Sequence, residues 1–391
     1  MSDPAACGRV PAAHAPPEGG AHAPRPTPPF TIEHERLRTE MRAFVARRLR
    51  PHADEWEAAR WFPNDAFRWV ADAGYLGLGL TDPVAAAVWV EELARCGSGG
   101  VAAGLGAHSG IALPPIARFG TAEQKARYVE PGRRGELIAA LAITEPGAGS
   151  DVAGIRTQAR RVDDGYVVNG SKTFITGGVR ADILVTAVKT TQDGGHHGLS
   201  FLIIENNPAH PGVSSTPLRK LGWHASDTAE IAFDDVFVPG ENLLGTEHQG
   251  FYLIMANFQW ERLLMALGAV GAMQACLEQT LEFLRGRDDL RSQQAIRHRI
   301  AEIALELETG RAVTYAALRR LVAGEDAVRE VTIAKLRTQR AAFDVIDACV
   351  QIHGLDAPAE LERALCDARL GPIGGGTDEI MREILGRSMG L

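Results

Sequence analysis

Apolar residues recur at helical spacing from Thr31 to about residue 140. They lie three or four positions apart, which is the period that gives an α-helix one apolar face. The recurring positions are Leu37, Met41, Phe44, Val45, Leu49, Phe67, Val70, Leu76 and Leu78. The pattern predicts an all-helical domain over residues 31–140.

The pattern changes over residues 141–244. Short runs rich in Val, Ile, Phe and Thr, such as ADILVTAV and GLSFLIIE, are separated by Gly, Asp and Pro, as in strands joined by tight turns. We expect a middle β domain here, an antiparallel sheet or barrel.

Helical spacing returns over residues 245–391. The longest stretches run from Leu263 to Leu284, from Ile296 to Leu307 and from Ile333 to Val350. Long amphipathic helices joined by short links favour a four-helix bundle, and their broad apolar faces also suit subunit association. The predicted fold class is therefore α+β, in the order α, β, α.

Composition narrows the setting. The chain has 391 residues, a net charge of -8 and a pI of about 5.9, which argues against nucleic acid as a partner because duplex binding needs a concentrated basic face. Five cysteines without CxxC spacing predict neither a metal site nor a disulfide framework. No apolar run approaches the ~20 residues of a membrane span, and no secretory signal opens the chain. We expect a cytoplasmic protein with a disordered tail rich in Pro and Ala at residues 1–30.

Two segments of the middle domain carry candidate chemistry. Residues 141–151, LAITEPGAGSD, end in a turn whose N–H groups and hydroxyls (Thr144, Ser150) can hold an anion or the edge of a polar heterocycle. A plain surface loop has the same composition. Residues 174–176 of SKTFITGG place an aromatic ring, an apolar spacer and a hydroxyl in sequence. Each motif is weak alone.

A third segment has three consecutive glycines, residues 374–376, in front of a predicted helix. Glycines cost backbone entropy and offer no packing, so the run suggests that another group comes close. Thr377 is a plausible N-cap, followed by Asp378 and Glu379 in the first turn.

In their order along the chain, these motifs resemble the acyl-CoA dehydrogenase family. The same order includes KLGWHASDTAEIAFDDVFVP at 220–239, FQWERLL at 258–264 and GGGTDEIMREIL at 374–385. The resemblance implies FAD and an acyl-CoA substrate, with the α-hydrogen removed as a proton and the β-hydrogen transferred as hydride to flavin N5, giving the 2-enoyl thioester. It also implies a homotetramer, a dimer of dimers, and an electron acceptor such as an electron-transfer flavoprotein.

The resemblance also implies roles for single residues. Thr144 matches a residue near the flavin pyrimidine ring, Phe174 matches a ring stacked on the flavin, and Thr176 matches the hydroxyl that hydrogen-bonds N5. The other cofactor contacts that it implies within this chain are Leu141, Gly149, Ser150, Ile175, Thr377 and Glu379. Its implied substrate contacts are Ser150, Arg262, Gly375 and Gly376.

The position of the catalytic base that the resemblance implies differs from the commonest family pattern. Most relatives place a catalytic glutamate just before a Gly-Thr, where this chain has Gly375. The isovaleryl-CoA and long-chain acyl-CoA dehydrogenases supply it from a helical Glu-Arg-Leu segment, which predicts Glu261 as the base. We expect the missing side chain at 375 to leave volume for the Glu261 carboxylate, while Gly375 N–H still donates to the thioester carbonyl. The alternative is that Glu261 pairs with Arg262, or with an arginine one turn away, on a solvated helix.

Three loops are shorter than in the family. The loop at 81–90 borders the acyl site, which predicts a more open acyl pocket. The other two, at 285–294 and 354–360, carry FAD contacts across a dimer interface. The candidates left there are Arg287 and Gln294 for the pyrophosphate and Gln351 and Gly354 for the adenosine. The shortening bears on FAD affinity more than on the fold.

Two alternatives to an acyl-CoA dehydrogenase stay open. One is an acyl-carrier-protein thioester dehydrogenase of secondary metabolism, for which an opened acyl loop would be useful. The other is a flavin-poor structural subunit beside an active homologue. A base at Glu261 and a hydroxyl at Thr176 favour an enzyme, since a structural subunit needs neither. A nicotinamide enzyme is least favoured, because no GxGxxG follows a Val-rich strand.

Overall fold

The structure is a computed structural model that describes residues 26–191, 195–206 and 211–391. Short helices form the N-terminal part, and Thr31, Asp82 and Ser98 cap three of them by accepting backbone N–H groups. These helices are α1 (Ile32–Arg48), α2 (Ala53–Ala59), α3 (Asp65–Asp72), α4 (Pro83–Leu93), α5 (Gly99–Ala107), α6 (Leu113–Phe119), α7 (Ala122–Gln124) and α8 (Glu130–Arg133). The predicted helical N-terminal domain is confirmed.

A sheet follows in the middle of the chain. Its strands are β1 (Ala139–Ala142), β2 (Gln158–Val162), β3 (Gly165–Ile175), β4 (Ile183–Lys189), β5 (Leu199–Glu205), β6 (Val213–Pro217), β7 (Ala229–Pro239) and β8 (Leu243–Leu244). The order is β6-β7-β3-β2-β4-β5-β8, with β1 beside β4. The sheet is mixed rather than wholly antiparallel, because β4 pairs in parallel with β1 and β2, and it does not close into a barrel. Every residue of β4 is buried, as is usual for a strand that pairs in parallel with its neighbours.

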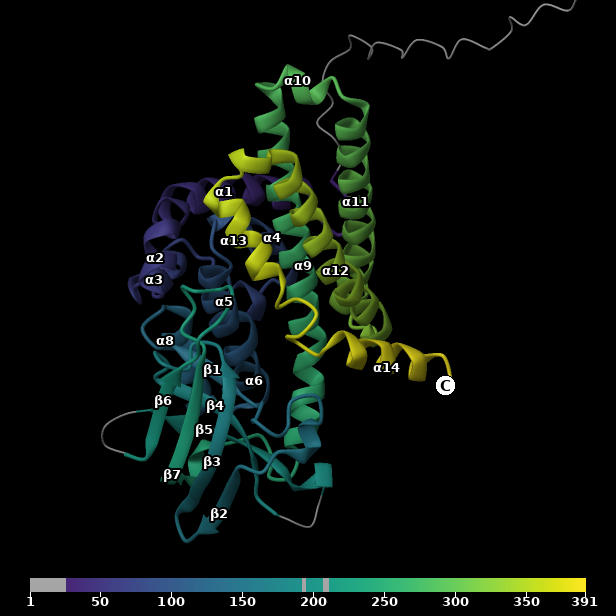
Figure 1. Cartoon of the computed structure of the whole chain (residues 1–391). Coiled ribbons are helices and arrows are strands. Elements are labelled where there is room, and N and C mark those ends of the chain that lie inside the picture. Colours follow the sequence, from purple (N-terminus) through teal and green to yellow (C-terminus); the bar gives the residue numbers. More distant parts are fainter. Residues whose placement is uncertain (1–25, 192–194, 207–210) are drawn as a thin grey trace, which may run out of the picture.

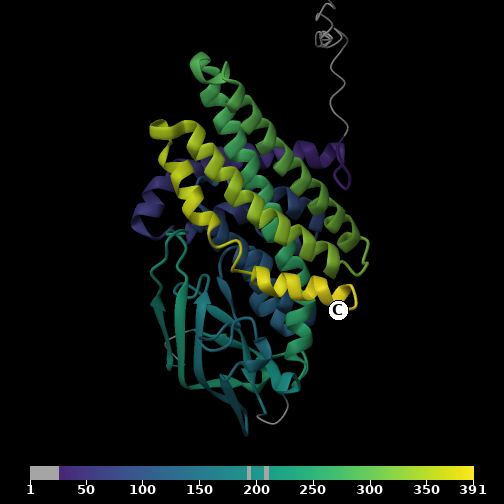
Figure 2. The same cartoon turned by 45° about the vertical axis from the view of Figure 1, so that its right-hand side comes forward.

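The C-terminal part is a helical bundle. It comprises α9 (Gly250–Arg285), α10 (Asp288–Arg291), α11 (Gln294–Val322), α12 (Val328–His353), α13 (Ala359–Ala368) and α14 (Asp378–Ser388). Helices α9, α11 and α12 match the three predicted long helices and pack on one another. Figures 1 and 2 show α9 running from the sheet to the opposite end of the molecule, where α10 lies.

Helix α9 also joins the parts of the core. It packs against α4 on the N-terminal side and against α12 on the other, and its buried residues belong both to the core shared with the N-terminal helices and to that of the bundle. A site on α9 therefore has rigid elements on several sides.

The predicted disordered tail of residues 1–30 overlaps the described residues only at its end. Residues 1–25 of the predicted tail lie outside the described residues, whereas Phe30 is buried with its ring centroid 4.8 Å from that of Tyr315. Across the described ranges, we find no helix with the length and apolar character of a membrane span.

Candidate functional site

The turn predicted to hold a polar heterocycle is fastened to β3. Thr173 N–H donates to the Thr144 carbonyl oxygen at 2.9 Å. Glu145 accepts from the fully buried Lys172 Nζ at 2.8 Å and from Thr157 N–H at 2.9 Å. Burial alone would raise the pKa of Glu145, but attraction to Lys172 and these hydrogen bonds lower it. The carboxylate therefore stays charged and fixes the turn.

Phe174 adds an exposed aromatic ring beside the turn that is hydrogen-bonded to β3. Its backbone has φ 59, at the register shift between β3 and β7, and its side chain is 69% exposed. Ile175 is buried below it, while Thr176 borders a cavity. An exposed ring with hydroxyls nearby fits one face of a planar polar heterocycle, so these residues fit the flavin of FAD.

The other predicted flavin contacts of this region lie around the same turn. Leu141 is half-buried on β1, and Gly149 and Ser150 are exposed at the end of the turn. Their roles toward a cofactor stay predictions.

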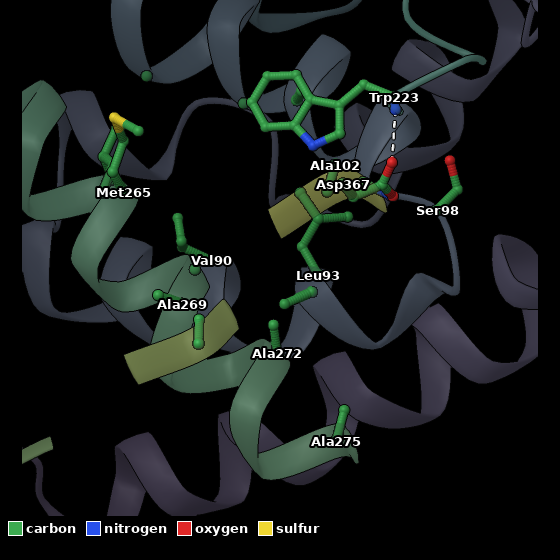
Figure 3. A pocket seen from close by; sticks show the side chains of 18 of the residues that line it. Val90, Leu93, Ser98, Ala102, Trp223, Met265, Ala269, Ala272, Ala275 and Asp367 are labelled. Atoms are coloured by element: carbon green, nitrogen blue, oxygen red, sulfur yellow. Dashed lines mark hydrogen bonds between the residues drawn. The ribbon is translucent and has the colours of Figure 1, made fainter. Parts of the chain in front are cut away.

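The cavity has a volume of about 310 Å³ and lies among α4, α5, α9, α12 and α13. Figure 3 shows Val90 and Leu93 from α4 and Ala269, Ala272 and Ala275 from α9 among the side chains that line it. Its wall is mostly apolar, which suits an alkyl chain.

The three glycines form a loop (residues 371–377, the glycine loop) that two cations hold. Arg262 Nε donates to the Gly375 carbonyl oxygen at 3.2 Å, and the buried Lys335 Nζ donates to the Gly376 carbonyl oxygen at 2.6 Å. Gly375 and Gly376 have φ +62 and +98, a region that favours glycine. Within the described chain Gly375 N–H makes no backbone hydrogen bond. The loop thus leaves a donor free.

The N-cap prediction is confirmed at the end of this loop. The Thr377 side chain accepts from Ile380 N–H at 3.3 Å, and Glu379 lies in the first turn of α14. Arg262 is buried against the loop with its guanidinium over Phe258. Its predicted substrate contact is untested, and its visible contact is to the loop.

Glu261 lies beside the loop-holding arginine on α9. Its Oε2 is buried and finds no hydrogen-bond partner among the described residues. Burial raises the pKa of Glu261 to about 7, although Arg262 works in the opposite direction. The alternative of an ion-paired glutamate on a solvated helix does not hold in the structure.

The predicted use of the space at residue 375 is wrong. A Cβ built there would overlap the sulfur of Met265, so the thioether fills the volume that we expected the Glu261 carboxylate to occupy. Met265 lies one turn after Glu261 on α9, and an unbranched thioether fills irregular gaps well.

The shortened loop at 81–90 does not leave the neighbouring side of the cavity open, because a side chain from α9 covers it. The indole of Trp260 lies 3.6 Å from where a Cβ on Gly79 would be and lines the cavity. Its Nε1 is buried without a partner in the described chain. The wall thus holds an unsatisfied donor, and Glu261, which follows Trp260 on α9, holds an unsatisfied acceptor.

The residues predicted for the adenosine arm lie elsewhere. Arg287 donates to Asp289 and Asp356, each at 2.9 Å, and Gln351 donates to Asp347. Gln294 pairs with His298 at 3.4 Å, and Gly354 has φ 60 at the end of α12. Figure 1 places this region, the bundle tip (residues 283–294 and 351–356), at the end remote from the sheet. Within one chain these residues do not meet Phe174.

Sequence reasoning missed several residues of the site. Lys335 holds the glycine loop, Met265 fills the space at 375, Trp260 closes the wall, and Lys172 fixes the turn. A signal existed for Lys335, because it occupies the apolar face of a predicted helix, next to Ala334. Nothing in the pattern indicated Met265, whose role depends on a contact across the bundle.

Comparisons with known proteins agree with this architecture. Family models match residues 31–136, 140–236 and 248–390, described as the N-terminal, middle and C-terminal domains of acyl-CoA dehydrogenase. The chain is 35% identical over 366 residues to the mitochondrial isovaleryl-CoA dehydrogenase of Arabidopsis thaliana, covering 88% of each chain. It is 33% identical over 384 residues to the mitochondrial long-chain specific acyl-CoA dehydrogenase of Mus musculus, covering 92% of this chain and 87% of that one.

The fold has the same likeness. A crystal structure of a probable acyl CoA dehydrogenase from Mycobacterium abscessus matches with a TM-score of 0.88 and 41% identity, over 92% of this chain and 99% of that one. The chain therefore belongs to the acyl-CoA dehydrogenase family, FAD-dependent oxidoreductases that act on the CH–CH bond of acyl-CoA thioesters.

Proposed function

We propose that this chain oxidises an acyl-CoA between its α and β carbons with Glu261 as the base that takes the α-proton. The observation that carries the proposal is the buried Glu261 Oε2, which no described protein group satisfies. A pKa of about 7 makes Glu261 a stronger base than an exposed carboxylate while leaving it largely ionised slightly above neutral pH.

The glycine loop makes the α-proton more acidic. Gly375 N–H donates to the thioester carbonyl oxygen, where negative charge develops as the proton leaves. Arg262 and Lys335 hold the neighbouring carbonyl groups, so the donor is oriented before substrate arrives. Gly376 and Ser150 are the further proposed substrate contacts.

FAD, when bound, supplies the acceptor for the β-hydride at its N5. Phe174 would support the ring face, Thr176 would donate to N5, Thr144 would lie near the pyrimidine ring, and Ser150 near the phosphate. The remaining proposed contacts of this chain with the cofactor are Leu141, Gly149, Ile175, Thr377 and Glu379.

The bundle tip serves the FAD of a second copy in this proposal. Arg287 and Gln294 flank α10, and Gln351 and Gly354 lie at the end of α12. Figure 1 shows α10 at the end of the molecule remote from the sheet that contains β3. We therefore propose a dimer as the smallest unit competent for FAD and a homotetramer as the assembly. An electron-transfer flavoprotein is the proposed acceptor, and the cytoplasm is the proposed location.

The test uses the FAD-loaded protein under anaerobic conditions. Glu261→Gln should retain flavin but lose nearly all bleaching by acyl-CoA, because the amide cannot take a proton. Glu282→Gln is the matched control, since this glutamate is exposed on the same helix. Normal bleaching by Glu261→Gln would exclude it as the base. A protein that cannot take up FAD would favour the flavin-poor subunit, and bleaching by acyl-carrier-protein thioesters alone would favour the carrier-protein enzyme.

A further inference from the structure

We propose, on the basis of the proposed function, that the preferred substrate carries an unbranched acyl chain of about ten carbons or more with a plain methyl end. The deep half of the cavity, beyond Met265, would select such a chain through its length, its volume and the chemistry of its wall.

The length of the deep half of the cavity can be taken from the residues of α9 that line it. Met265, Gly268, Ala272 and Ala275 line the cavity in succession along this helix. Met265 lies against the glycine loop, so Ala275 marks greater depth. At ~1.5 Å of rise per residue, Met265 and Ala275 are about 15 Å apart along the axis. A butanoyl or isovaleryl group would leave the deep half empty.

The volume agrees with that length. The cavity of about 310 Å³ is far larger than the ~10–15 Å³ that a cavity needs to hold one water molecule, so it has room for a long acyl chain. Residues with small or no side chains keep it open on two helices, Ala102 and Gly106 on α5 and Ala272 on α9. A Cβ on Gly106 would meet nothing within 4 Å.

The chemistry of the wall selects the end of the chain. No Lys, Arg or His belongs to the described lining, whose charged residues are Glu360 and Asp367. Both oxygens of Asp367 are used, because Trp223 N–H and Gly99 N–H donate to them at 2.5 and 3.0 Å (Figure 3). A second carboxylate on the acyl chain would therefore meet repulsion from these acidic groups and no basic side chain in the described lining.

The experiment separates chain-length preference from catalysis by measuring binding. The Kd values of butanoyl-, isovaleryl-, octanoyl-, dodecanoyl- and glutaryl-CoA are measured on FAD-loaded Glu261→Gln protein, and bleaching is measured on the unmodified holoenzyme. We expect dodecanoyl-CoA to bind at least a hundredfold more tightly than butanoyl-CoA, since each buried methylene is worth about fourfold. Isovaleryl- and glutaryl-CoA should bind no better than butanoyl-CoA.

Two variants test the depth. Ala275→Leu should weaken dodecanoyl-CoA at least tenfold and leave octanoyl-CoA within twofold, whereas Ala272→Leu should weaken both. Ala301→Leu, exposed on α11, is the matched control and should change neither, and thermal unfolding checks that each variant folds.

The possible results have different meanings. Equal or tighter binding of isovaleryl-CoA, or an equal effect of the variants on every chain length, would overturn the inference. Length-dependent binding without bleaching of the unmodified protein would support the inference and refute the proposed catalysis instead.

Discussion

Glu261 combines a buried, unsatisfied carboxylate oxygen with a pKa raised to about 7 by burial. The ionised form is the base, so kcat/KM should rise with pH through about 7 and level off above it. A pH profile of anaerobic flavin reduction measures this. A flat profile between pH 5 and pH 9 would contradict the assignment.

The raised pKa of Glu261 also predicts how the stability of the folded protein depends on pH. The ordinary pKa is 4.5, so between about pH 4.5 and pH 7 the folded protein holds a proton that the unfolded chain has released. Stability contributed by Glu261 therefore falls as pH rises through this window. Glu261→Gln should be more stable than the unmodified protein at pH 8, by up to about 3 kcal/mol, and nearly equal at pH 4.5. Thermal unfolding at both pH values tests this, and an advantage confined to low pH would contradict it.

Gly375 and Gly374 provide a matched pair of substitutions. Gly375→Ala should lower the melting temperature and reduce substrate-driven bleaching at least tenfold, because φ is +62 and a Cβ would displace Met265. The strain alone costs about 1 kcal/mol. Gly374→Ala should be tolerated, since its Cβ would make ordinary contacts of 3.6 Å and longer. Equal effects of the two would show that the loop does not need this conformation.

For single residues, the sequence predicted which residues belong to the candidate site better than it predicted their contacts. Glu261 and Thr377 could be assigned from motif and capping preference, and the structure confirms the cap. The partner of Gly375 could not be assigned, because Met265 reaches it only through the packing of α9 against the glycine loop. The loop-holding role of Lys335 depends on the same packing.

The turn at residues 144–150 and strand β3 act as one element because a buried ion pair joins them. Lys172→Met would leave the Glu145 carboxylate buried and unpaired, which costs about 3–5 kcal/mol. We expect a lower melting temperature and a smaller bound FAD fraction, measured by thermal unfolding and by absorbance.

Two further variants test the specificity of that effect. Adding Glu145→Gln to Lys172→Met should recover part of the loss, because no buried charge then remains. Arg134→Met, which breaks an exposed ion pair with Glu136, should leave the melting temperature nearly unchanged, because exposed ion pairs contribute little to stability. If Lys172→Met cost no more than Arg134→Met, the ion pair would not fix the turn.

The elements themselves were largely predictable. Helical periodicity indicated α9, α11 and α12, because each buries an apolar face along its length. The parallel pairing of β4 with β1 and β2 was not predictable from alternation, since a strand buried on both faces has none. The close approach of Trp260 to Gly79 was missed because loop length indicates a gap and not the side chain that fills it.

The bundle tip lies at the end of the molecule remote from the sheet that carries the proposed flavin contacts (Figure 1). If a second copy completes that site, Arg287→Gln should weaken FAD binding about tenfold without lowering the melting temperature of the apoprotein. Flavin titration and thermal unfolding measure the two effects. Arg291→Gln, an exposed arginine of α10 paired with Asp288, is the control. Equal FAD affinity in both variants would mean that Arg287 serves only its own ion pairs.

The three-part order of the molecule could be predicted from its patterns, because each part has its own periodicity. The proposed relation between the tip and the flavin site of a second copy could not be derived from periodicity, and only the family resemblance implies it. Loop lengths around Arg287 and Gly354 indicated altered cofactor contacts, but not that Asp289 and Asp356 hold Arg287.

The most direct test of FAD-dependent acyl-CoA dehydrogenation is the visible absorption spectrum of the purified protein, followed by anaerobic titration with dodecanoyl-CoA. The account predicts one flavin per subunit and stoichiometric loss of the oxidised flavin spectrum as the 2-enoyl thioester forms. A protein that remains colourless with excess FAD, or a bound flavin that no acyl-CoA reduces, would contradict it.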